Sequence, residues 1–193
     1  MPVQQTNIVW TDLSANHHVA CAKGERGCRN CWAADVADRF GRTSEPWTVA
    51  NVEENLRVYD EDISALLQRR EPGWCFFPSS SDPFLPQLPE AAYAEWREAI
   101  EANDHLCFQA LTKWGPETER ELEPLPPNVM LGVTVETPRR LYRLDWLREQ
   151  QAAVKFVSFE PLIEPIENPD LTGIGWAIVG GESGVDRRRW EPR

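Results

Sequence analysis

The sequence predicts an α/β fold in which about six parallel strands, covered by outer helices, form a partial β/α barrel. Short runs rich in β-branched and aromatic residues alternate with longer segments of helical periodicity, which is typical of parallel strands joined by crossover helices. Each of these apolar runs ends in polar or charged residues. Active-site side chains of a β/α barrel come from the carboxyl ends of its strands. The pattern therefore favours a barrel over an open sheet, in which only the strands at a switch point contribute.

The predicted elements alternate along the chain. We expect strands near residues 7–11, 74–79, 106–112, 129–136, 154–159 and 176–180. We expect helices near residues 31–40, 53–69, 90–102 and 139–149, with a shorter candidate near 116–121. The helix at 90–102 has the clearest pattern because Tyr93, Trp96 and Ile100 form one apolar stripe.

Length and composition indicate a single domain over residues 1–193. With 193 residues, of which 41% are hydrophobic, the chain can bury one sizeable core. No apolar stretch is long enough to span a membrane, and the first residues lack the basic and then apolar pattern of a signal peptide. We therefore expect a cytoplasmic protein with no membrane partner, in which cysteines stay reduced.

The net charge of −11 argues against a broad nucleic-acid surface, because affinity for phosphates comes mainly from Lys and Arg. A local basic groove stays open as an alternative. Four arginines recur with helical spacing and four more crowd the C-terminus: Arg139, Arg140, Arg143, Arg148, Arg187, Arg188, Arg189 and Arg193. The interpretation we favour is a solvated helix face and a charged tail.

Cys21, Cys28 and Cys31 form the pattern that is most informative about function. They follow the first predicted strand and precede the first predicted helix, with six and then two residues between them. In a reducing compartment such a cluster indicates a metal or catalytic site and not a disulfide framework. Three thiolates can hold a metal centre and leave one coordination position open for chemistry. Cys75 and Cys107 stand alone in apolar runs, and we expect both in the core.

Two kinds of metal centre are compatible with this spacing. The three cysteines could complete a closed tetrahedral zinc site with His17 or His18, which would only stiffen the loop. Alternatively, they could hold an iron–sulfur cluster without a further protein ligand. The predicted barrel favours the iron–sulfur site, because the cysteine loop would then face the polar strand ends.

The predicted strand ends supply a set of candidate site residues. They are Ser80, Asp82, Lys113, Glu136, Glu160, Gly180, Gly181 and Glu182. We expect them to converge with the cysteines at one mouth. For Glu160 and Glu182, a structural hydrogen bond between neighbouring loops is an equal alternative. The run 180–184 lacks the Lys and the spacing of a P-loop, so it does not indicate a nucleoside triphosphate site.

Several strings of this sequence occur together in a known family: WTD, the cysteine loop with CWAADVADRFG, SSSDPF, FQALTK, NVMLGVTVE, FVSFEPL and AIVGGESG. In this order, over residues 10–184, they resemble the phage-type three-Cys-motif proteins, which are similar to radical SAM enzymes. The resemblance implies a 4Fe-4S cluster on Cys21, Cys28 and Cys31, with S-adenosylmethionine bound at the fourth iron. It implies an enzyme that takes an electron from a donor, generates a deoxyadenosyl radical and acts on an unidentified substrate. A nucleic acid or nucleotide in a bacterial host cell is one candidate.

If S-adenosylmethionine binds at the open iron, the candidate site residues at the strand ends are expected to hold it, and we treat each role as a hypothesis. Ser80 and Asp82 would bind the ammonium group of S-adenosylmethionine. Gly180 and Gly181 would let the backbone approach the adenine or methionine closely, because no side chain intervenes, and Glu182 is a further candidate for ligand contact. The remaining three, Lys113, Glu136 and Glu160, would bind the ribose hydroxyls, the carboxylate or the substrate.

The chain departs from the family pattern at several points. Its six residues between Cys21 and Cys28 exceed the usual radical SAM spacing, and Asn30 stands where an aromatic residue commonly precedes the last cysteine. The chain stops at Arg193, where relatives continue, so it is either truncated or closes its barrel differently. The alternative function is a non-catalytic phage metal-binding protein that docks on a host or phage partner.

Overall fold

The computed structural model describes residues 4–120, 122–184 and 186–188. Its elements, in chain order, are β1 (Gln4–Gln5), β2 (Leu13–Ser14), β3 (His18–Val19), η1 (Arg26–Cys28), α1 (Trp32–Arg39), η2 (Val49–Asn51), α2 (Val52–Asn55), β4 (Arg57–Val58), α3 (Asp60–Gln68), β5 (Gly73–Phe76), α4 (Glu90–Glu101), β6 (Leu106–Thr112), η3 (Gly115–Glu117), β7 (Val129–Thr134), η4 (Pro138–Arg140), α5 (Tyr142–Glu149), β8 (Val154–Phe159) and β9 (Trp176–Val179).

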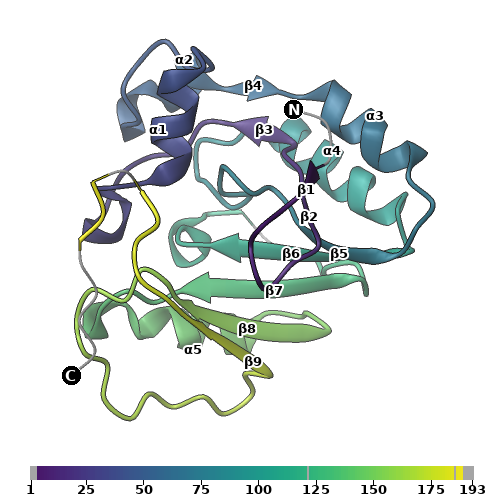
Figure 1. The fold of residues 1–193 in the computed structure, drawn as a ribbon. Helices are drawn as coiled ribbons and strands as arrows, with labels where there is room; N and C mark the ends of the chain where they lie inside the picture. Colours follow the sequence, from purple (N-terminus) through teal and green to yellow (C-terminus); the bar gives the residue numbers. More distant parts are fainter. Residues whose placement is uncertain (1–3, 121, 185, 189–193) are drawn as a thin grey trace.

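The main sheet is a half-barrel of parallel strands (Figure 1). Its seven strands lie in the order β1-β2-β5-β6-β7-β8-β9. Strand β1 is antiparallel to β2, and the other six run parallel to one another. The predicted α/β class and the partial barrel of six parallel strands are therefore confirmed.

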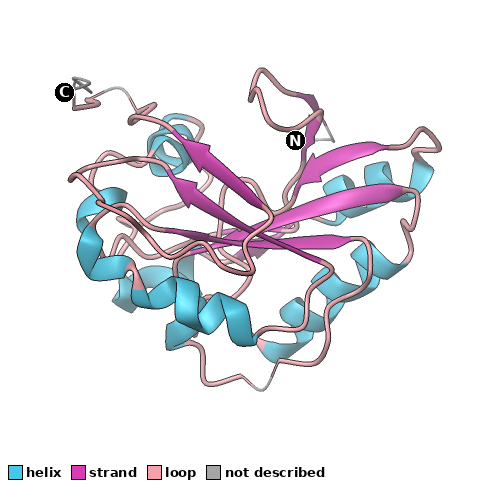
Figure 2. Cartoon of the chain, turned by 90° about the horizontal axis from the view of Figure 1, so that it is seen from below, coloured by secondary structure: helices cyan, strands magenta, loops and turns pink. Residues whose placement is uncertain are grey.

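The outer face of the sheet carries the main hydrophobic core. Most helices lie along one side of the curved sheet (Figure 2). Phe108 of β6 and Leu131 of β7 are fully buried in one cluster with Trp96 and Ile100 of α4. Burying each such side chain contributes about 1.5–3 kcal/mol, so this layer fixes the helices on the sheet. Of the helices described, none is long and apolar enough to cross a membrane.

The inner face of the half-barrel is apolar near the amino ends of the strands and charged beyond their carboxyl ends. Met130, Phe156 and Ile178 form a second buried cluster on this face. Side chains alternate along a strand, so Glu136 and Glu160, at even separations from Met130 and Phe156, continue the same face. The half-barrel therefore has an apolar floor and a charged mouth.

The expected strand at 7–11 is wrong. Residues 9 and 10 lie in a turn between β1 and β2, and the first parallel strand is only Leu13–Ser14. The Thr11 hydroxyl donates to the carbonyl oxygens of Leu13 and Trp74, and the Asp12 carboxylate accepts from the Trp74 amide at 2.9 Å. These side-chain bonds compete with strand pairing. Thr11 and Asp12 consequently stand before the strand and not at its carboxyl end.

The expected helix at 53–69 is interrupted. It divides into α2 and α3, with β4 between them pairing antiparallel with β3. The Tyr59 amide donates to the His17 carbonyl at 2.7 Å, which continues this pairing. Tertiary hydrogen bonds thus override the local helical pattern over residues 57–59.

Two further elements differ in extent. The expected short helix at 116–121 is a single 3₁₀ turn, Gly115–Glu117, and residue 121 lies outside the described residues. The expected helix at 139–149 begins with the 3₁₀ turn η4 and becomes α-helical at Tyr142. The solvated arginine face expected there is wrong at one position, because Arg143 is fully buried.

Candidate metal and ligand site

The cysteine loop, defined here as residues 20–31, lies over the carboxyl ends of β6 and β7. Lys113, just after β6, places its Nζ atom 3.8 Å from Cys28 Sγ. Glu136, beyond the end of β7, packs against Gly27 so closely that a Cβ atom at Gly27 would lie 2.9 Å from its Cγ. Only glycine fits this approach. The loop that carries the cysteines is therefore in direct contact with two of the strand-end residues.

Burial affects the thiols of this loop unequally. Cys28 is buried, while Cys21 and Cys31 are half-buried, and all five cysteines of the chain are free thiols. Desolvation raises the pKa of Cys21 well above its ordinary value, and the nearby Asp82, Cys28 and Cys31 add to this effect. Desolvation also raises the pKa of Cys28, although the Lys113 charge opposes it. A cationic centre that binds these sulfurs as thiolates would relieve this cost.

The backbone just before Cys21 adopts an uncommon conformation. Ala20 has φ of 128°, in a region that residues with a side chain rarely adopt, and it is fully buried. Such a conformation costs on the order of 1–3 kcal/mol and persists only where the surroundings impose it. Packing therefore fixes the direction in which the chain enters the cysteine loop.

A buried charge network ties the cysteine loop to β7 and α5. Arg143 donates from Nη1 to the Thr134 carbonyl at 2.8 Å and to Glu136 Oε2 at 3.0 Å, and from Nη2 to Glu25 Oε1 at 2.5 Å. Burial, followed by a hydrogen bond with Glu25, raises the pKa of Glu136 to about 7. The pKa of Glu25 is lowered, because hydrogen bonds and the nearby arginines outweigh its burial. Glu136 is thus the more readily protonated of the two carboxyl groups.

Among the polar side chains at the mouth, Lys113 and Glu160 make the fewest hydrogen bonds and ion pairs. Glu160 is half-buried and makes no hydrogen bond or ion pair with any residue the structure describes. Burial raises the pKa of Glu160, and the Lys113 charge opposes this. Burial alone would lower the pKa of Lys113, but Cys28, Glu136 and Cys31 outweigh it and raise that pKa. Both groups retain hydrogen-bonding capacity for a ligand.

Ser80 and Asp82 are engaged in tying loops together. The Asp82 carboxylate accepts from the Thr112 hydroxyl at 2.7 Å and from the Lys113 amide at 2.8 Å, with further bonds from two other amides. Ser80 donates its hydroxyl and its amide to Asn16 Oδ1, both at 2.7 Å. Asn16 follows β2, so these bonds join the loops after β2, β5 and β6.

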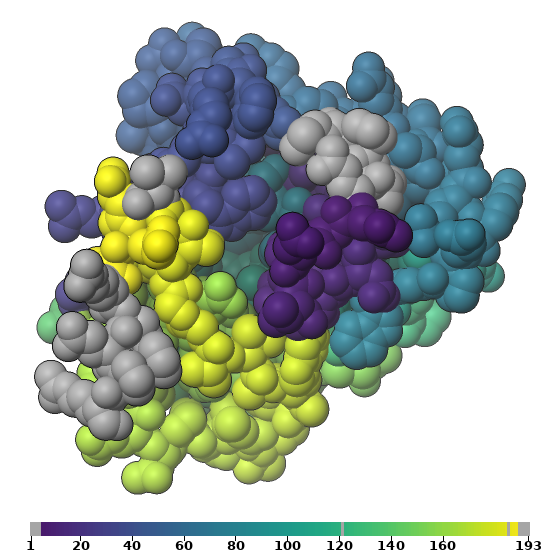
Figure 3. All heavy atoms as spheres, in the orientation of Figure 1, coloured from purple at the N-terminus to yellow at the C-terminus, as the bar shows by residue number. Residues whose placement is uncertain are grey.

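Glu182 joins the loop after β9 to the cysteine loop. It accepts from Asn30 Nδ2 at 3.0 Å and pairs with Arg188, which also donates to the Arg26 carbonyl at 3.0 Å. Figure 3 shows this C-terminal segment, in yellow, packed beside the N-terminal third of the chain. Gly180 and Gly181 are half-buried. A Cβ atom at Gly180 would lie 2.9 Å from Glu160 Cδ, so this glycine leaves room for the carboxylate.

The histidines and cysteines of the described residues do not form an assembled site for a single metal ion. A zinc ion needs its ligands within about 2.3 Å of one point. Among the described residues, no three His, Cys, Asp or Glu side chains are gathered so that they could hold a metal ion. His17 and His18 face each other, with their Nδ1 atoms 3.2 Å apart, and His17 Nε2 lies 3.6 Å from Glu95 Oε2. A 4Fe-4S cluster takes one thiolate per iron, so its thiolates surround a volume and not a point.

A comparison with protein-family models gives one match, described as Protein of unknown function (DUF5131), over residues 5–193. The chain belongs to this family. No curated protein and no solved structure matches it. The DUF5131 match includes the cysteine loop and the six parallel strands.

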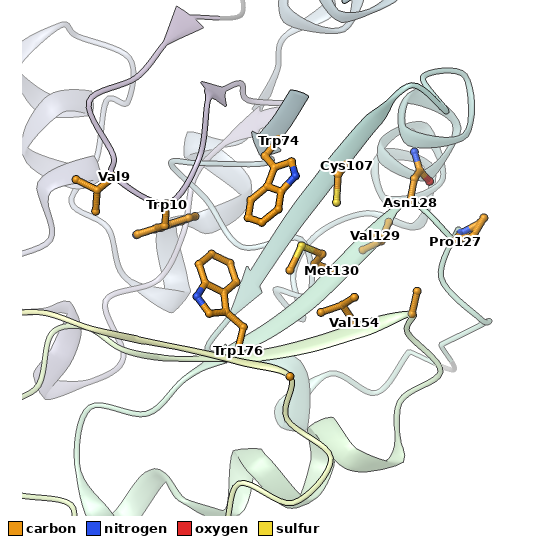
Figure 4. Close-up of a pocket in the computed structure, with 12 residues that line it drawn as sticks. Val9, Trp10, Trp74, Cys107, Pro127, Asn128, Val129, Met130, Val154 and Trp176 are labelled. Atoms are coloured by element: carbon orange, nitrogen blue, oxygen red, sulfur yellow. The ribbon is translucent and has the colours of Figure 1, made fainter. Parts of the chain in front are cut away.

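In this DUF5131 protein a concavity lies at the amino ends of the strands, opposite the mouth. Its volume is about 720 Å³, and its walls include Trp10, Trp74, Met130 and Trp176 (Figure 4). The Trp74 and Trp176 rings meet edge to face with centroids 5.8 Å apart. The lining residues include no acidic or basic side chain. This cavity can bind apolar groups, and the groups suited to acid–base or metal chemistry are at the mouth.

Proposed function

We propose that this protein is a radical SAM-type enzyme in which Cys21, Cys28 and Cys31 hold a 4Fe-4S cluster and S-adenosylmethionine binds at the open iron. The observation that carries the proposal is the position of the three free thiols, in one loop over the charged mouth of a parallel half-barrel, with Lys113 Nζ 3.8 Å from Cys28 Sγ. Active sites of β/α barrels occupy this end of the strands.

When bound and reduced, such a cluster would supply one electron to break the sulfonium C–S bond, which would give methionine and a deoxyadenosyl radical able to abstract hydrogen from a substrate. The chain itself binds and orients. The Lys113 ammonium group is suited to the ligand carboxylate, and the Glu160 carboxylate to the ligand ammonium group or ribose hydroxyls. Below them, Met130, Phe156 and Ile178 form the apolar floor that keeps water out of the mouth from that side.

The other candidate residues support this arrangement in different ways. Glu136 accepts a hydrogen bond from Arg143 and contacts the cysteine loop, so we assign it to positioning. Ser80, Asp82 and Glu182 hold neighbouring loops in place through the hydrogen bonds described above. Any ligand contact of these three would therefore be secondary to loop positioning. Gly180 and Gly181 remain the positions where backbone approaches the ligand most closely.

The reaction requires an external electron donor and a reducing compartment. Five free cysteines suit the cytoplasm, which for a phage-encoded member is that of the bacterial host. The donor is a protein or small reductant that reaches the cluster through the loop surface.

Cleavage of S-adenosylmethionine tests the proposal. Anaerobic, cluster-loaded and reduced protein should convert it slowly to deoxyadenosine and methionine, detected by chromatography, even without substrate. Lys113→Ala should weaken binding of S-adenosylmethionine. The matched control Lys155→Ala should bind normally, because Lys155 donates to the Arg148 carbonyl and not toward the mouth. Iron-loaded protein that neither binds nor cleaves S-adenosylmethionine would overturn the assignment.

A second candidate is a non-catalytic metal-binding protein that docks on a partner. The apolar cavity with Trp74 exposed to 45% favours it, because exposed aromatic residues at such a surface can anchor a partner protein. On this alternative the cysteines would bind metal only to stiffen their loop. Metal identity separates the two candidates.

A further inference from the structure

We propose that the mouth binds single-stranded nucleic acid, with phosphates on a cationic rim and unpaired bases on two exposed aromatic rings. This inference rests on the proposed function and names its substrate class. We define the cationic rim as Lys23, Arg26, Arg29, Arg140, Arg187 and Arg188.

At the mouth, paired acidic side chains are buried, while the basic side chains of the rim reach solvent. Glu25, Glu136 and Glu182 have side chains exposed to only 10%, 1% and 4%, and each is paired with an arginine. These three acids are thus withdrawn from solvent and paired, whereas Glu160 stays half-buried and unpaired among the described residues. A phosphate that approaches the mouth meets little negative charge from the three paired acids.

The cations of the rim, by contrast, reach solvent. Lys23, Arg29 and Arg187 are exposed and form no ion pair with any described residue, and Arg26 is 68% exposed while paired with Glu164. Three acids, Glu117, Glu164 and Asp186, also reach solvent in this region, so the six cations of the rim outnumber them. Arginine forks match phosphate oxygens bidentately, which suits them to a nucleic-acid backbone.

The rim is continuous in space although its residues come from distant parts of the chain. Arg188 donates to the Arg26 carbonyl at 3.0 Å, and Arg140 Nη2 lies 3.0 Å from Glu25 Oε1, next to Arg26. The cysteine loop, the β7–α5 connection and the segment after β9 therefore present their cations side by side. A strand bound there lies against the loop that carries the three cysteines.

Exposed aromatic rings accompany these cations. Trp32, the residue after Cys31, is 38% exposed at the start of α1. Tyr142 is 40% exposed at the start of α5, and its hydroxyl accepts from Arg140 at 3.1 Å and donates to Glu117 at 2.6 Å. Unpaired bases stack on such rings, whereas bases in a duplex are already stacked. Cations with interleaved aromatics therefore favour a single strand over a duplex or an acidic peptide.

The overall charge of −11 is compatible with this site, and it limits how many nucleotides the protein can contact. The rest of the surface repels phosphates, so contacts are confined to a few nucleotides at the rim. Such binding is salt-sensitive because it rests on a small number of released counterions.

The test is fluorescence anisotropy of a labelled single strand of about 16 nucleotides, titrated with the full chain from about 0.05 to 0.2 M salt. The double variant Arg26→Ala/Arg29→Ala should bind at least about tenfold more weakly, with a salt dependence shallower by about 1.4 log units per log unit of salt. The matched control Arg69→Ala/Arg70→Ala changes two arginines at the end of α3 and should stay within about twofold. Equal loss in both double variants would overturn the proposal.

The aromatic contribution is tested separately. Trp32→Ala and Tyr142→Ala should each weaken binding about fivefold or more, whereas Tyr142→Phe, which keeps the ring, should bind as the unmodified protein does. Polyglutamate and a duplex of the same sequence serve as competitors. If either competes as well as the single strand and both aromatic variants bind normally, the rim is a general anion surface and the proposal is wrong.

Failure of this inference can be told apart from failure of the proposed function. The anisotropy assay contains no reductant and no S-adenosylmethionine, and the cleavage assay contains no nucleic acid. If the protein cleaves S-adenosylmethionine but does not bind the single strand, only the proposed substrate class is wrong. Strand binding without cleavage would remove the enzymatic role and leave a nucleic-acid-binding protein.

Discussion

Arg143 Nη2 lies 2.5 Å from Glu25 Oε1, joining an outer helix to the cysteine loop. The same guanidinium group holds Glu136, so three charged side chains are buried together beneath the cysteines. A buried arginine is costly unless its partners are present, and here each partner comes from a different element. The position of the cysteine loop therefore depends on α5 as well as on its own sequence.

Arg143→Met should destabilise the protein by about 3–5 kcal/mol, because it leaves Glu25 and Glu136 buried without their cation. Denaturant unfolding measures this loss. Arg139→Ala is the matched control, since Arg139 is exposed in η4 and should change the free energy of unfolding by about 0.5 kcal/mol or less. Similar stability of the two variants would show that the network does not hold the loop.

Single replacement of Cys21, Cys28 or Cys31 by Ala should abolish cluster binding, measured as iron and sulfide per chain after anaerobic reconstitution. Cys107→Ala is the control, because Cys107 lies in the wall of the distant apolar cavity and should leave the iron content unchanged. A loop variant that retains the full iron content would exclude that cysteine as a ligand.

The strands that the sequence predicts best are those with long apolar runs. Residues 106–112 and 154–159 form strands with these bounds, because buried apolar side chains on both faces stabilise each of them. The segment 7–11 has the same composition but forms a turn, since Trp10 packs on Phe76 and Trp176 at the floor of the half-barrel. Local composition does not reveal this tertiary packing.

The sequence marks polar side chains at the strand ends but does not reveal the residues that hold them in place. Polar residues after the apolar runs marked Lys113, Glu136 and Glu160 as candidates, and Lys113 and Glu136 contact the cysteine loop. Arg143 and Glu25 were missed, because each interacts with residues far away in the chain. Leu147, four residues after Arg143 and therefore on the same face of α5, is a core residue, and this spacing is a sequence signal that Arg143 can be buried.

Asp82 and Glu160 should respond oppositely to neutral substitution. Asp82→Ala removes a buried carboxylate that accepts four hydrogen bonds, and should cost about 3 kcal/mol or more of unfolding free energy. Glu160→Gln should change stability by about 0.5 kcal/mol or less while weakening binding of S-adenosylmethionine. Thermal unfolding and equilibrium binding, measured on both variants, check this. The reverse pattern would assign Asp82 to the ligand and Glu160 to the fold.

Acid should destabilise the protein through its buried histidine pair. Burial lowers the pKa of His17 to about 4 and that of His18 to about 3, from the ordinary value of 6.5. Well above pH 6.5 both histidines are neutral in the folded and in the unfolded chain, so they do not make stability depend on pH there. Below that pH the unfolded chain takes up protons that the native state rejects, so stability falls as pH drops toward 4.

Between pH 7 and pH 5, each histidine should lower the free energy of unfolding by on the order of 2 kcal/mol. Urea unfolding at both pH values, on the unmodified protein and on His18→Gln, isolates the effect because all other groups are shared. Between these two pH values, His18→Gln should lose about half as much unfolding free energy as the unmodified protein. An equal loss in the two proteins would mean that His18 titrates normally in the folded state.

The most direct test of the central claim is metal analysis of the anaerobically purified and reconstituted full chain. A cluster held by Cys21, Cys28 and Cys31 predicts brown protein with about four iron and four sulfide per chain. Its reduced electron paramagnetic resonance spectrum should change when S-adenosylmethionine is added, because that ligand binds the open iron. Colourless protein with one zinc per chain, and no response to S-adenosylmethionine, would contradict the account and leave a structural metal loop.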